Sequence, residues 1–213
     1  MGGALSSGNA APQAKASQHA RMPSFLNNIV DPLEDTHSKP QETYVYLVIG
    51  FGVAGGYVAK ELVHLKVPPG QVCIIGDEPW HAYERPALSK GYLNPPGSKS
   101  RARLPDFNVA VGTSGQAQDA DWYEGNGIKV MLSTRVTGVN LAKKMVKTES
   151  IGTLSTKATT ALIGYEKLII ATGAGAARFP DTPGQDLDGI FYLRAEADFA
   201  GALLSLPGRP RAF

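Results

Sequence analysis

The sequence predicts an α/β fold in which a parallel β-sheet is the middle of three layers. Three neighbouring features carry this prediction: an apolar run at residues 44–49, an amphipathic segment after it, and a second short apolar run at residues 72–75. A strand, a helix and a strand within about thirty residues form a βαβ unit, whose two strands are parallel and whose crossover is right-handed. With 213 residues, the chain is long enough to bury a core.

The first strand and the first helix of this unit are joined by a glycine-rich turn. Residues 44–49 are continuously apolar, which is typical of a strand covered on both faces. Apolar residues then recur at helical spacing, and these are Val58, Ala59, Leu62 and Val63. We expect the prolines at positions 68 and 69 to end the helix, and residues 72–75 to form the second buried strand.

The remaining elements are shorter. We expect short helices at residues 86–92 and 121–124, with a proline at the first helical position of the former. Three strands joined by tight turns are predicted at residues 128–132, 136–141 and 144–148, and we expect them to form a small inserted antiparallel sheet. A last buried strand is predicted at residues 167–171, and a weak helix at residues 195–206.

The composition excludes several classes of protein. The 21 basic and 19 acidic side chains leave a net charge of +2, which gives no electrostatic case for binding nucleic acid. Because no run of 18 apolar residues occurs, we expect no membrane span. The chain has one cysteine, Cys73, so it holds no internal disulfide and no Cys-x-x-Cys redox pair. We expect Cys73 to be a buried side chain of its strand.

Residues 1–43 differ from the rest of the chain. They are rich in Ala, Ser, Gly, Asn and Gln, they lack apolar periodicity, and their first acidic residue is Asp31. This composition predicts either a disordered tail or a transit peptide, and the two alternatives stay open because the segment holds few arginines.

The glycine-rich turn has the spacing of a dinucleotide-binding loop, Gly50-x-Gly52-x-x-Gly55. In such a loop the first glycine permits the tight turn, the second lets the backbone approach a diphosphate, and the third lets the helix pack closely. The helix then begins with unpaired N–H groups and a partial positive charge. We therefore predict that the loop, including Val53 and Ala54, binds the diphosphate of a nucleotide cofactor.

Acidic residues stand where such a loop requires one. Asp77 and Glu78 lie 22 and 23 positions beyond Gly55, at the end of the second predicted strand. A carboxylate there accepts hydrogen bonds from an adenosine ribose and repels a 2′-phosphate. The cofactor predicted for this site is therefore FAD or NAD, and not NADP.

The end of the last predicted strand favours FAD. The strand runs into Ala171-Thr172-Gly173, which resembles the point where a strand leaves the FAD domain of flavoprotein reductases with two dinucleotide sites. The predicted inserted sheet precedes it in the same order. We therefore expect a Rossmann-like FAD-binding domain with an inserted antiparallel sheet, as an incomplete form of the two-dinucleotide fold.

One block makes the resemblance specific. Residues 81–93, HAYERPALSKGYL, closely resemble the block after the second strand in the monodehydroascorbate reductases of plants and algae. Residues 102–112, 122–123, 132–134 and 191–194 are also similar, and the resemblance covers residues 44–200. Reductases of the bacterial ferredoxin-linked type share the RP-x-LSK part more loosely.

The resemblance implies a flavoenzyme in which FAD takes a hydride from NAD(P)H and returns electrons singly to two monodehydroascorbate radicals. The flavin carries this chemistry, so no catalytic side chain and no metal site are assigned. The cofactor-binding residues that the resemblance and the loop imply together are Gly50, Gly52, Val53, Ala54, Gly55, Asp77, Glu78, Arg85, Lys90, Val136, Ala171, Thr172, Gly173 and Arg194.

Each implied residue has a role. Glu78 matches the ribose-binding acid, with Asp77 beside it, while Arg85 and Lys90 match basic residues that hold the FAD phosphates and face the flavin. Val136 matches a backbone contact to the adenine side. Arg194 matches an arginine that an acid usually follows directly, but here Ala195 follows and Glu196 comes one position later.

The chain is shorter than the fold that it resembles. We expect residues 44–206 to form the first part of the FAD-binding domain and residues 207–213 an atypical end, with the NAD(P)H-binding and interface domains absent. Such a fragment is expected to bind FAD weakly and to lack NAD(P)H turnover, because each lost charged hydrogen bond costs about 1.5–3 kcal/mol.

Two alternatives to this function stay open, as does the cellular compartment. One is a reductase that feeds ferredoxin or a quinone, and the other is a non-catalytic FAD-binding module. We expect a cytoplasmic protein, with the chloroplast as the alternative.

Overall fold

The structure is a computed structural model that describes residues 38–90, 118–152, 158–198 and 201. Residues 1–37 of the tail predicted at residues 1–43, the end of the helix predicted at 86–92 and most of the helix predicted at 195–206 lie outside the described residues. The last residues of the predicted tail are described, and the first strand begins two residues earlier than predicted, at Glu42. The elements follow in the order β1 (Glu42–Ile49), α1 (Val53–His64), β2 (Val72–Ile75), the 3₁₀ helix η2 (Arg85–Ser89), α2 (Ala120–Gly125), β3 (Ile128–Met131), β4 (Thr134–Asn140), β5 (Met145–Ser150) and β6 (Thr160–Ile170).

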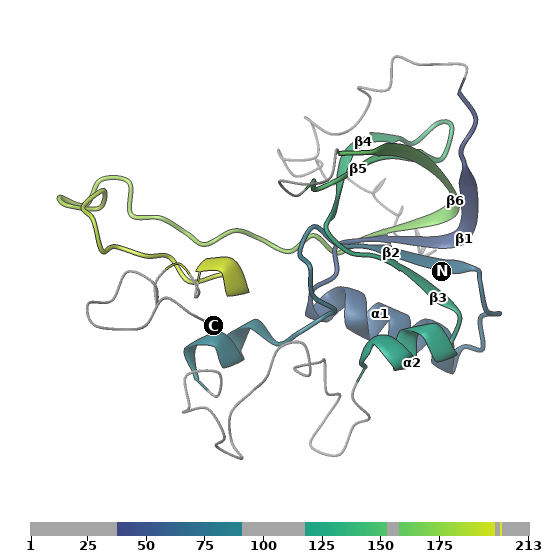
Figure 1. The fold of residues 1–213 in the computed structure, drawn as a ribbon, viewed down its shortest axis with the longest axis horizontal. Helices are drawn as coiled ribbons and strands as arrows, with labels where there is room; N and C mark the ends of the chain where they lie inside the picture. The colour runs from purple at the N-terminus through teal and green to yellow at the C-terminus, as the bar shows by residue number, and fades with distance from the viewer. Residues whose placement is uncertain (1–37, 91–117, 153–157, 199–200, 202–213) are drawn as a thin grey trace, which may run out of the picture.

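The strands form one six-stranded sheet in the order β3-β2-β1-β6-β5-β4 (Figure 1). Strand β1 is parallel to β2 on one side and to β6 on the other, and β2 is parallel to β3. Strands β4, β5 and β6 pair antiparallel. The predicted βαβ unit is therefore confirmed. Strands β2 and β3 lie on one side of β1, and the later strands β4, β5 and β6 lie on the other side.

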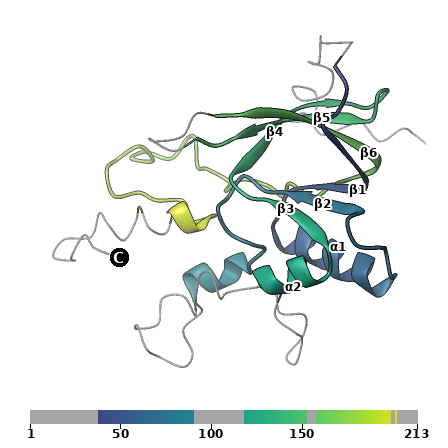
Figure 2. The same cartoon turned by 45° about the vertical axis from the view of Figure 1, so that its right-hand side comes forward.

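Three layers are visible in Figure 2: the helices α1 and α2, the parallel strands, and the curled antiparallel strands β4, β5 and the start of β6. The long β6 belongs to both sheets, because its residues 160–164 pair with β5 while residues 163–170 pair with β1. In the described part of the chain, the second face of the parallel sheet is thus covered by strands where a doubly wound fold has helices.

One part of the predicted inserted sheet is wrong. The strand predicted at residues 128–132 does not join the antiparallel layer; as β3, it extends the parallel sheet beside β2. The reason is the register of its apolar residues. Ile128 and Val130 lie on the face that α1 and α2 cover, and the buried β2 offers backbone N–H and C=O groups on its open edge for β3 to pair with. The other two predicted strands are confirmed as β4 and β5.

The hydrophobic core has one cluster on each face of the parallel sheet. Val48, Ile74 and Ala59 belong to the cluster under the helices, where Tyr123 of α2 also lies. Leu47, Cys73 and Ile75 belong to the cluster under the antiparallel strands, and Cys73 is fully buried there as predicted. Because alternate residues of β1 and β2 enter different clusters, both strands are continuously apolar, which is why their sequences were recognisable.

Three elements differ from the sequence prediction by more than two residues or in type. Helix α1 ends at His64, before the prolines, because Lys66 takes a left-handed conformation with φ of 56°. The short helix after Glu84 is a 3₁₀ turn with a proline in its first turn. Strand β6 begins at Thr160, seven residues before the predicted start, because its first half pairs with β5.

No helix in the described residues is long and apolar enough to cross a membrane.

Candidate dinucleotide-binding site

A cleft of about 280 Å³ opens at the carboxyl ends of β1, β2 and β6. The chain continues from β1 to β2 on one side and returns to β6 on the other, so the cleft lies at the point where the strand order reverses. Open α/β sheets bind their ligands at this switch point, outside the carboxyl ends of the strands. The residues that line the cleft are Gly50, Phe51, Gly52, Val53, Ala54, Gly76, Asp77, Glu78, Trp80, Arg85, Pro86, Ala171, Thr172, Gly173 and Arg194.

Each of the three positions of the loop favours glycine for a different geometric reason. Gly50 has a φ of 104°, and a Cβ atom there would collide with the backbone of Ala171. A Cβ at Gly55 would collide with the carbonyl oxygen of Gly50, so this glycine lets the first turn of α1 approach the loop. A Cβ at Gly52 would enter open space, so this glycine leaves backbone exposed at the cleft.

The amino end of α1 faces the cleft through Gly52, Val53 and Ala54. Gly52 is the N-cap residue, no side chain of the described residues caps the helix, and the first turn holds no acidic residue. The N–H groups of that turn and the positive end of the helix dipole are therefore left for an external partner. This arrangement fits an anionic diphosphate, since an open Gly52 permits the close approach that the N–H groups require.

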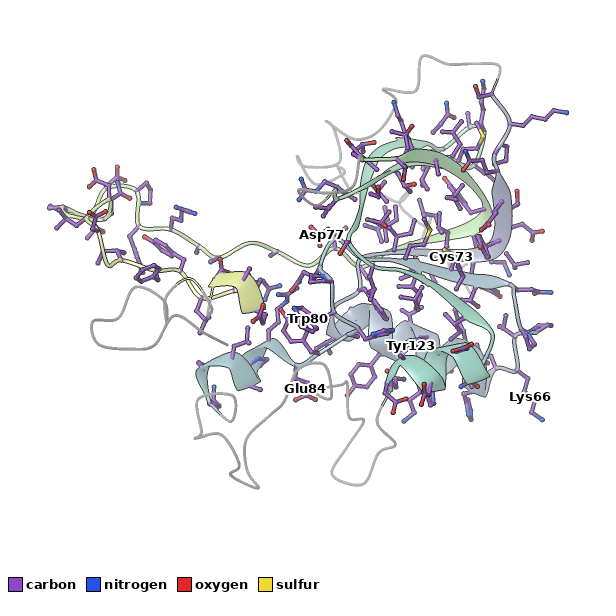
Figure 3. All side chains as sticks on the ribbon, in the orientation of Figure 1. Lys66, Cys73, Asp77, Trp80, Glu84 and Tyr123 are labelled. Carbon is purple, nitrogen blue, oxygen red and sulfur yellow. The ribbon has the colours of Figure 1, made fainter. Side chains whose placement is uncertain are left out.

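The two acids after β2 lie in different surroundings. The carboxylate of Glu78 pairs with the guanidinium of Arg85 and accepts a 2.6 Å hydrogen bond from the Tyr83 hydroxyl, and its side chain is 25% exposed. Asp77 is 60% exposed, and its charged partner among the described residues is the exposed Arg135, at 3.9 Å. Figure 3 shows Asp77 and Trp80 on the side of the molecule where the cleft opens. Both acids are thus available to ribose hydroxyls, although Glu78 already has protein partners.

Burial raises the pKa of the Tyr83 phenol, and the hydrogen bond to Glu78 raises that pKa further. The phenol therefore keeps its proton at physiological pH and donates it to the carboxylate. Arg85 Nη1 donates to the Tyr83 hydroxyl at 3.0 Å and to the carbonyl oxygen of Arg194 at 2.9 Å. Arg85 thus lies in the cleft wall, and both terminal nitrogens of its guanidinium have protein partners, because Nη2 pairs with Glu78.

The segment after β6 forms the opposite wall. The N–H of Ala171 donates to the carbonyl oxygen of Ile49, so this segment lies directly against the turn at Gly50. Gly173 has a φ of 69°, and a Cβ there would lie 3.1 Å from Arg194 Nη2. The glycine of the Ala-Thr-Gly sequence therefore makes room for the arginine that comes 21 residues later.

A second cavity of about 190 Å³ adjoins the first and shares Gly50, Asp77 and Thr172 with it. Val136 of β4 lines this second cavity, beside the β-bulge between Val136 and Gly138. A cofactor that fills both cavities would contact Val136, as its predicted place on the adenine side requires.

The structure brings most of the predicted residues together. Lys90 and Gly55 do not line the cleft: Lys90 is exposed at the end of η2, and Gly55 is buried against the loop. Sequence reasoning missed Phe51, Gly76, Trp80, Pro86 and the buried Tyr83. The position of Trp80 and Tyr83 close after the acids was a signal for the site. Residue type gave no help, because apolar and aromatic side chains are so often core residues that type alone does not distinguish site residues from core residues.

The fold and the cleft define a nucleotide-binding α/β protein. A family model described as pyridine nucleotide-disulphide oxidoreductase matches residues 44–206, and the chain belongs to this family. Membership implies FAD as the cofactor of this site.

Within this family, the chain is similar to monodehydroascorbate reductases. The chain is 41% identical over 170 residues to monodehydroascorbate reductase 5, chloroplastic, of Oryza sativa subsp. japonica, covering 80% of this chain and 32% of that protein. It is 41% identical over 171 residues to the chloroplastic/mitochondrial monodehydroascorbate reductase of Arabidopsis thaliana, covering 80% and 33%. The chain therefore spans about a third of the length of the curated relatives that it matches.

Solved structures agree on the fold. The NADH:rubredoxin oxidoreductase of Clostridium acetobutylicum is similar with a TM-score of 0.53 and 28% identity, covering 75% of this chain and 34% of that one. A NAD-dependent persulfide reductase of A. fulgidus has a TM-score of 0.54 at 22% identity, covering 74% and 27%, which shows the fold alone.

Proposed function

We propose that this chain supplies the FAD-binding part of an NAD(P)H oxidoreductase of the monodehydroascorbate reductase type. The observation that carries the proposal is the open, uncapped amino end of α1 behind Gly52, placed at the switch point between β1 and β6. The likeness of 41% to monodehydroascorbate reductases supports the same function. The flavin of FAD, once bound, would carry electrons from NAD(P)H to monodehydroascorbate radicals.

The residues of this chain would bind and orient the ADP half of the cofactor. The N–H groups of Val53 and Ala54 would donate to the diphosphate, and Asp77 and Glu78 would accept from the ribose hydroxyls. Arg85 and Arg194 lie where they would balance the phosphate charge. Val136 would contact the adenine from the second cavity.

Lys90 would face the flavin. It is exposed and follows η2 directly, so its side chain can approach a cofactor from the outer side of the cleft. Ala171, Thr172 and Gly173 would line the flavin side of the diphosphate, where their backbone lies beside the turn at Gly50.

Titration of the purified chain with FAD tests this function. We expect saturable quenching of flavin fluorescence, reversed by ADP, because the cleft provides the diphosphate and ribose contacts that FAD and ADP share. FMN, which lacks the adenosine, should compete poorly. Equal binding of FMN and FAD, or no effect of ADP, would overturn the assignment of this cleft.

A segment exchange tests the electron-transfer reaction. Residues 44–206 would replace the matching segment of the rice relative, and NADH-dependent reduction of the monodehydroascorbate radical would be measured. The same exchange with the Arabidopsis relative, also 41% identical to this chain, is the matched control. We expect activity in both hybrid proteins; a hybrid that reduces ferredoxin or a quinone and not the radical would favour the other acceptor.

The cellular compartment of the protein is also a proposal. The names of the relatives include chloroplastic, peroxisomal and cytosolic proteins, so the likeness alone fits more than one compartment. We propose the cytoplasm, with the chloroplast as the alternative. A fluorescent protein fused after Phe213 tests this, since import into plastids would contradict the cytoplasm.

A further inference from the structure

Tyr83 lies between β2 and η2 with 2% of its surface exposed. Its hydroxyl donates to Glu78 Oε2 at 2.6 Å and accepts from Arg85 Nη1 at 3.0 Å. It also accepts from the backbone N–H of Glu196 at 3.1 Å. One donated and two accepted hydrogen bonds use the ordinary capacity of a phenol.

The partners of this hydroxyl come from distant parts of the sequence. Glu78 lies three residues after β2 and Arg85 begins η2, whereas Glu196 is 113 residues away from Tyr83. Between β6 and Glu196 the chain runs out from the sheet as an extended arm and returns (Figure 1). Phe179, Leu187 and Ile190 of this arm are exposed, so apolar burial does little to hold the arm in place.

The returning segment forms a compact turn before it contacts Tyr83. Asp198 Oδ2 accepts from the N–H groups of Arg194 and Ala195, at 3.0 and 2.7 Å. A carboxylate at the third helical position that accepts from the N-cap N–H is half of a capping box, and it fixes the direction in which the helix begins. Tyr83 therefore contacts a preformed unit, residues 194–198, which we call the return turn.

The return turn carries Arg194 into the wall of the cleft. Arg194 lines the cleft, and its Nη2 lies beside Gly173 on the segment that follows β6. Its carbonyl oxygen accepts from Arg85 Nη1, so the turn is attached to the Tyr83–Arg85 pair at two points. Loss of the Tyr83 hydroxyl would remove one of them and weaken the alignment of the other.

We propose that Tyr83 is a positioning residue, whose hydroxyl fastens the return turn to the Glu78–Arg85 ion pair and so holds Arg194 in the cofactor cleft. The contact between Tyr83 and the return turn does not depend on a cofactor. The effect of this contact on cofactor affinity rests on the proposed FAD function, so the contact and the affinity are measured separately.

Limited trypsin digestion measures the fastening without any cofactor. Cleavage after Arg194 would be compared with cleavage after Arg178, an exposed residue of the same arm, by mass spectrometry. In the Tyr83→Phe variant we expect cleavage after Arg194 to be about three- to tenfold faster, the change that follows from one lost hydrogen bond. Cleavage after Arg178 should not change.

Tyr123→Phe is the matched control. Tyr123 is 1% exposed, and its hydroxyl bonds to Gln118 and not to the return turn. Equal acceleration in the two variants would mean general loosening of the fold and would overturn the proposal. So would an unchanged Tyr83→Phe rate. Hydrogen exchange of the Glu196 amide, faster only in Tyr83→Phe, gives a second measure of the same contact.

A surface variant keeps the test valid if Tyr83→Phe fails to fold. Glu196→Pro removes the N–H that bonds to Tyr83, at the first helical position where proline is tolerated. Glu196→Ala keeps this N–H and removes the same charge. We expect exchange of the Ala197 and Asp198 amides to be about three- to tenfold faster in Glu196→Pro than in Glu196→Ala. Equal exchange would overturn the proposal.

FAD affinity measures the consequence. We expect about three- to tenfold weaker FAD binding in both Tyr83→Phe and Glu196→Pro. The double variant should bind no more weakly than Tyr83→Phe alone, because Tyr83→Phe already removes the hydrogen bond that Glu196→Pro removes. Additive losses would contradict a shared contact. A wild-type chain that binds no FAD would overturn the proposed function, while the trypsin and exchange rates would still decide whether Tyr83 fastens the return turn.

Discussion

One wall of the cleft is backbone and the other is side chain. The backbone wall consists of the loop at Gly50–Gly52 and the segment 171–173, which pair through Ala171 and Ile49 over the buried core. The side-chain wall consists of Glu78, Tyr83 and Arg85 with the return turn, all of them joined by polar contacts. The first wall is fixed by the folding of the sheet, and the second by a few hydrogen bonds.

The difference indicates how changes in each wall should behave. A change in the backbone wall strains the sheet or blocks the diphosphate directly, so its effect should be large. A change in the side-chain wall removes single polar contacts, each with a net value of about 0.5–1.5 kcal/mol. Such changes should alter affinity and local mobility while the fold persists.

The largest effect is expected from Gly50→Ala. The φ of 104° and the collision of a Cβ with the backbone of Ala171 should together lower the free energy of unfolding by about 3 kcal/mol. Urea unfolding followed by tryptophan fluorescence measures this loss. Gly70→Ala is an instructive control, because its φ is also positive but a Cβ would meet nothing within 4 Å. A loss no greater than that of the control would show that the close approach to Ala171 is unimportant.

Gly52→Ala should separate binding from stability. Gly52 has a negative φ of −86° and open space at the Cβ position, so we expect a change in stability below about 1 kcal/mol. The added methyl group would stand where the diphosphate approaches, and FAD affinity should fall at least about tenfold, or about 1.4 kcal/mol. Fluorescence titration and urea unfolding of the same preparation check both. Unchanged affinity would place the diphosphate elsewhere.

A smaller effect is expected from Glu78→Gln. The variant loses the ion pair with Arg85 but keeps an acceptor for Tyr83, and the pair is only partly exposed, so stability should fall by about 1 kcal/mol. Asp77→Asn is the matched control, since its contact with Arg135 is long and exposed and should contribute less than about 0.5 kcal/mol. Comparable losses in the two variants would contradict the different surroundings of the acids.

The smallest effect is expected in the pH dependence of stability. His81 packs against Phe51 and Tyr123, and burial lowers its pKa, with Asp119 opposing that shift. Because the unfolded chain then binds a proton more readily than the folded chain, stability should fall as the pH drops below about 6.5. His81→Phe should remove part of this dependence in thermal unfolding between pH 5 and 7.5. An unchanged pH dependence in His81→Phe would contradict this account.

The backbone wall was predictable because its signals are local. The strands at Tyr44–Ile49 and Val72–Ile75, the glycine spacing and the acids after β2 each lie within one short stretch of sequence. The antiparallel strands β4 and β5 were predictable for the same reason. Asp77 and Ala171 were placed at the same edge of the sheet simply because both follow parallel strands.

In the side-chain wall, Glu78, Arg85 and Arg194 were predicted through the family resemblance. The contacts that attach the return turn to this wall were not predictable, because they join residues more than 100 positions apart. The only local signal for Tyr83 was its position close after the acids, and this position did not indicate a contact with Glu196. The strand at residues 128–132 was assigned to the wrong sheet for a related reason: its apolar pattern fits either partner, and only the free edge of β2 decides. The role of Lys90 stays a prediction.

Amide chemical-shift mapping with ADP tests most directly whether the glycine loop binds the cofactor diphosphate. The largest changes should fall on Gly52, Val53 and Ala54, with smaller ones on Thr172 and Gly173. Adenosine, which has no phosphate, should shift residues near Asp77 and leave Gly52 unchanged. Changes of equal size with ADP and adenosine at Gly52, or changes remote from the carboxyl ends of β1 and β6, would contradict the account.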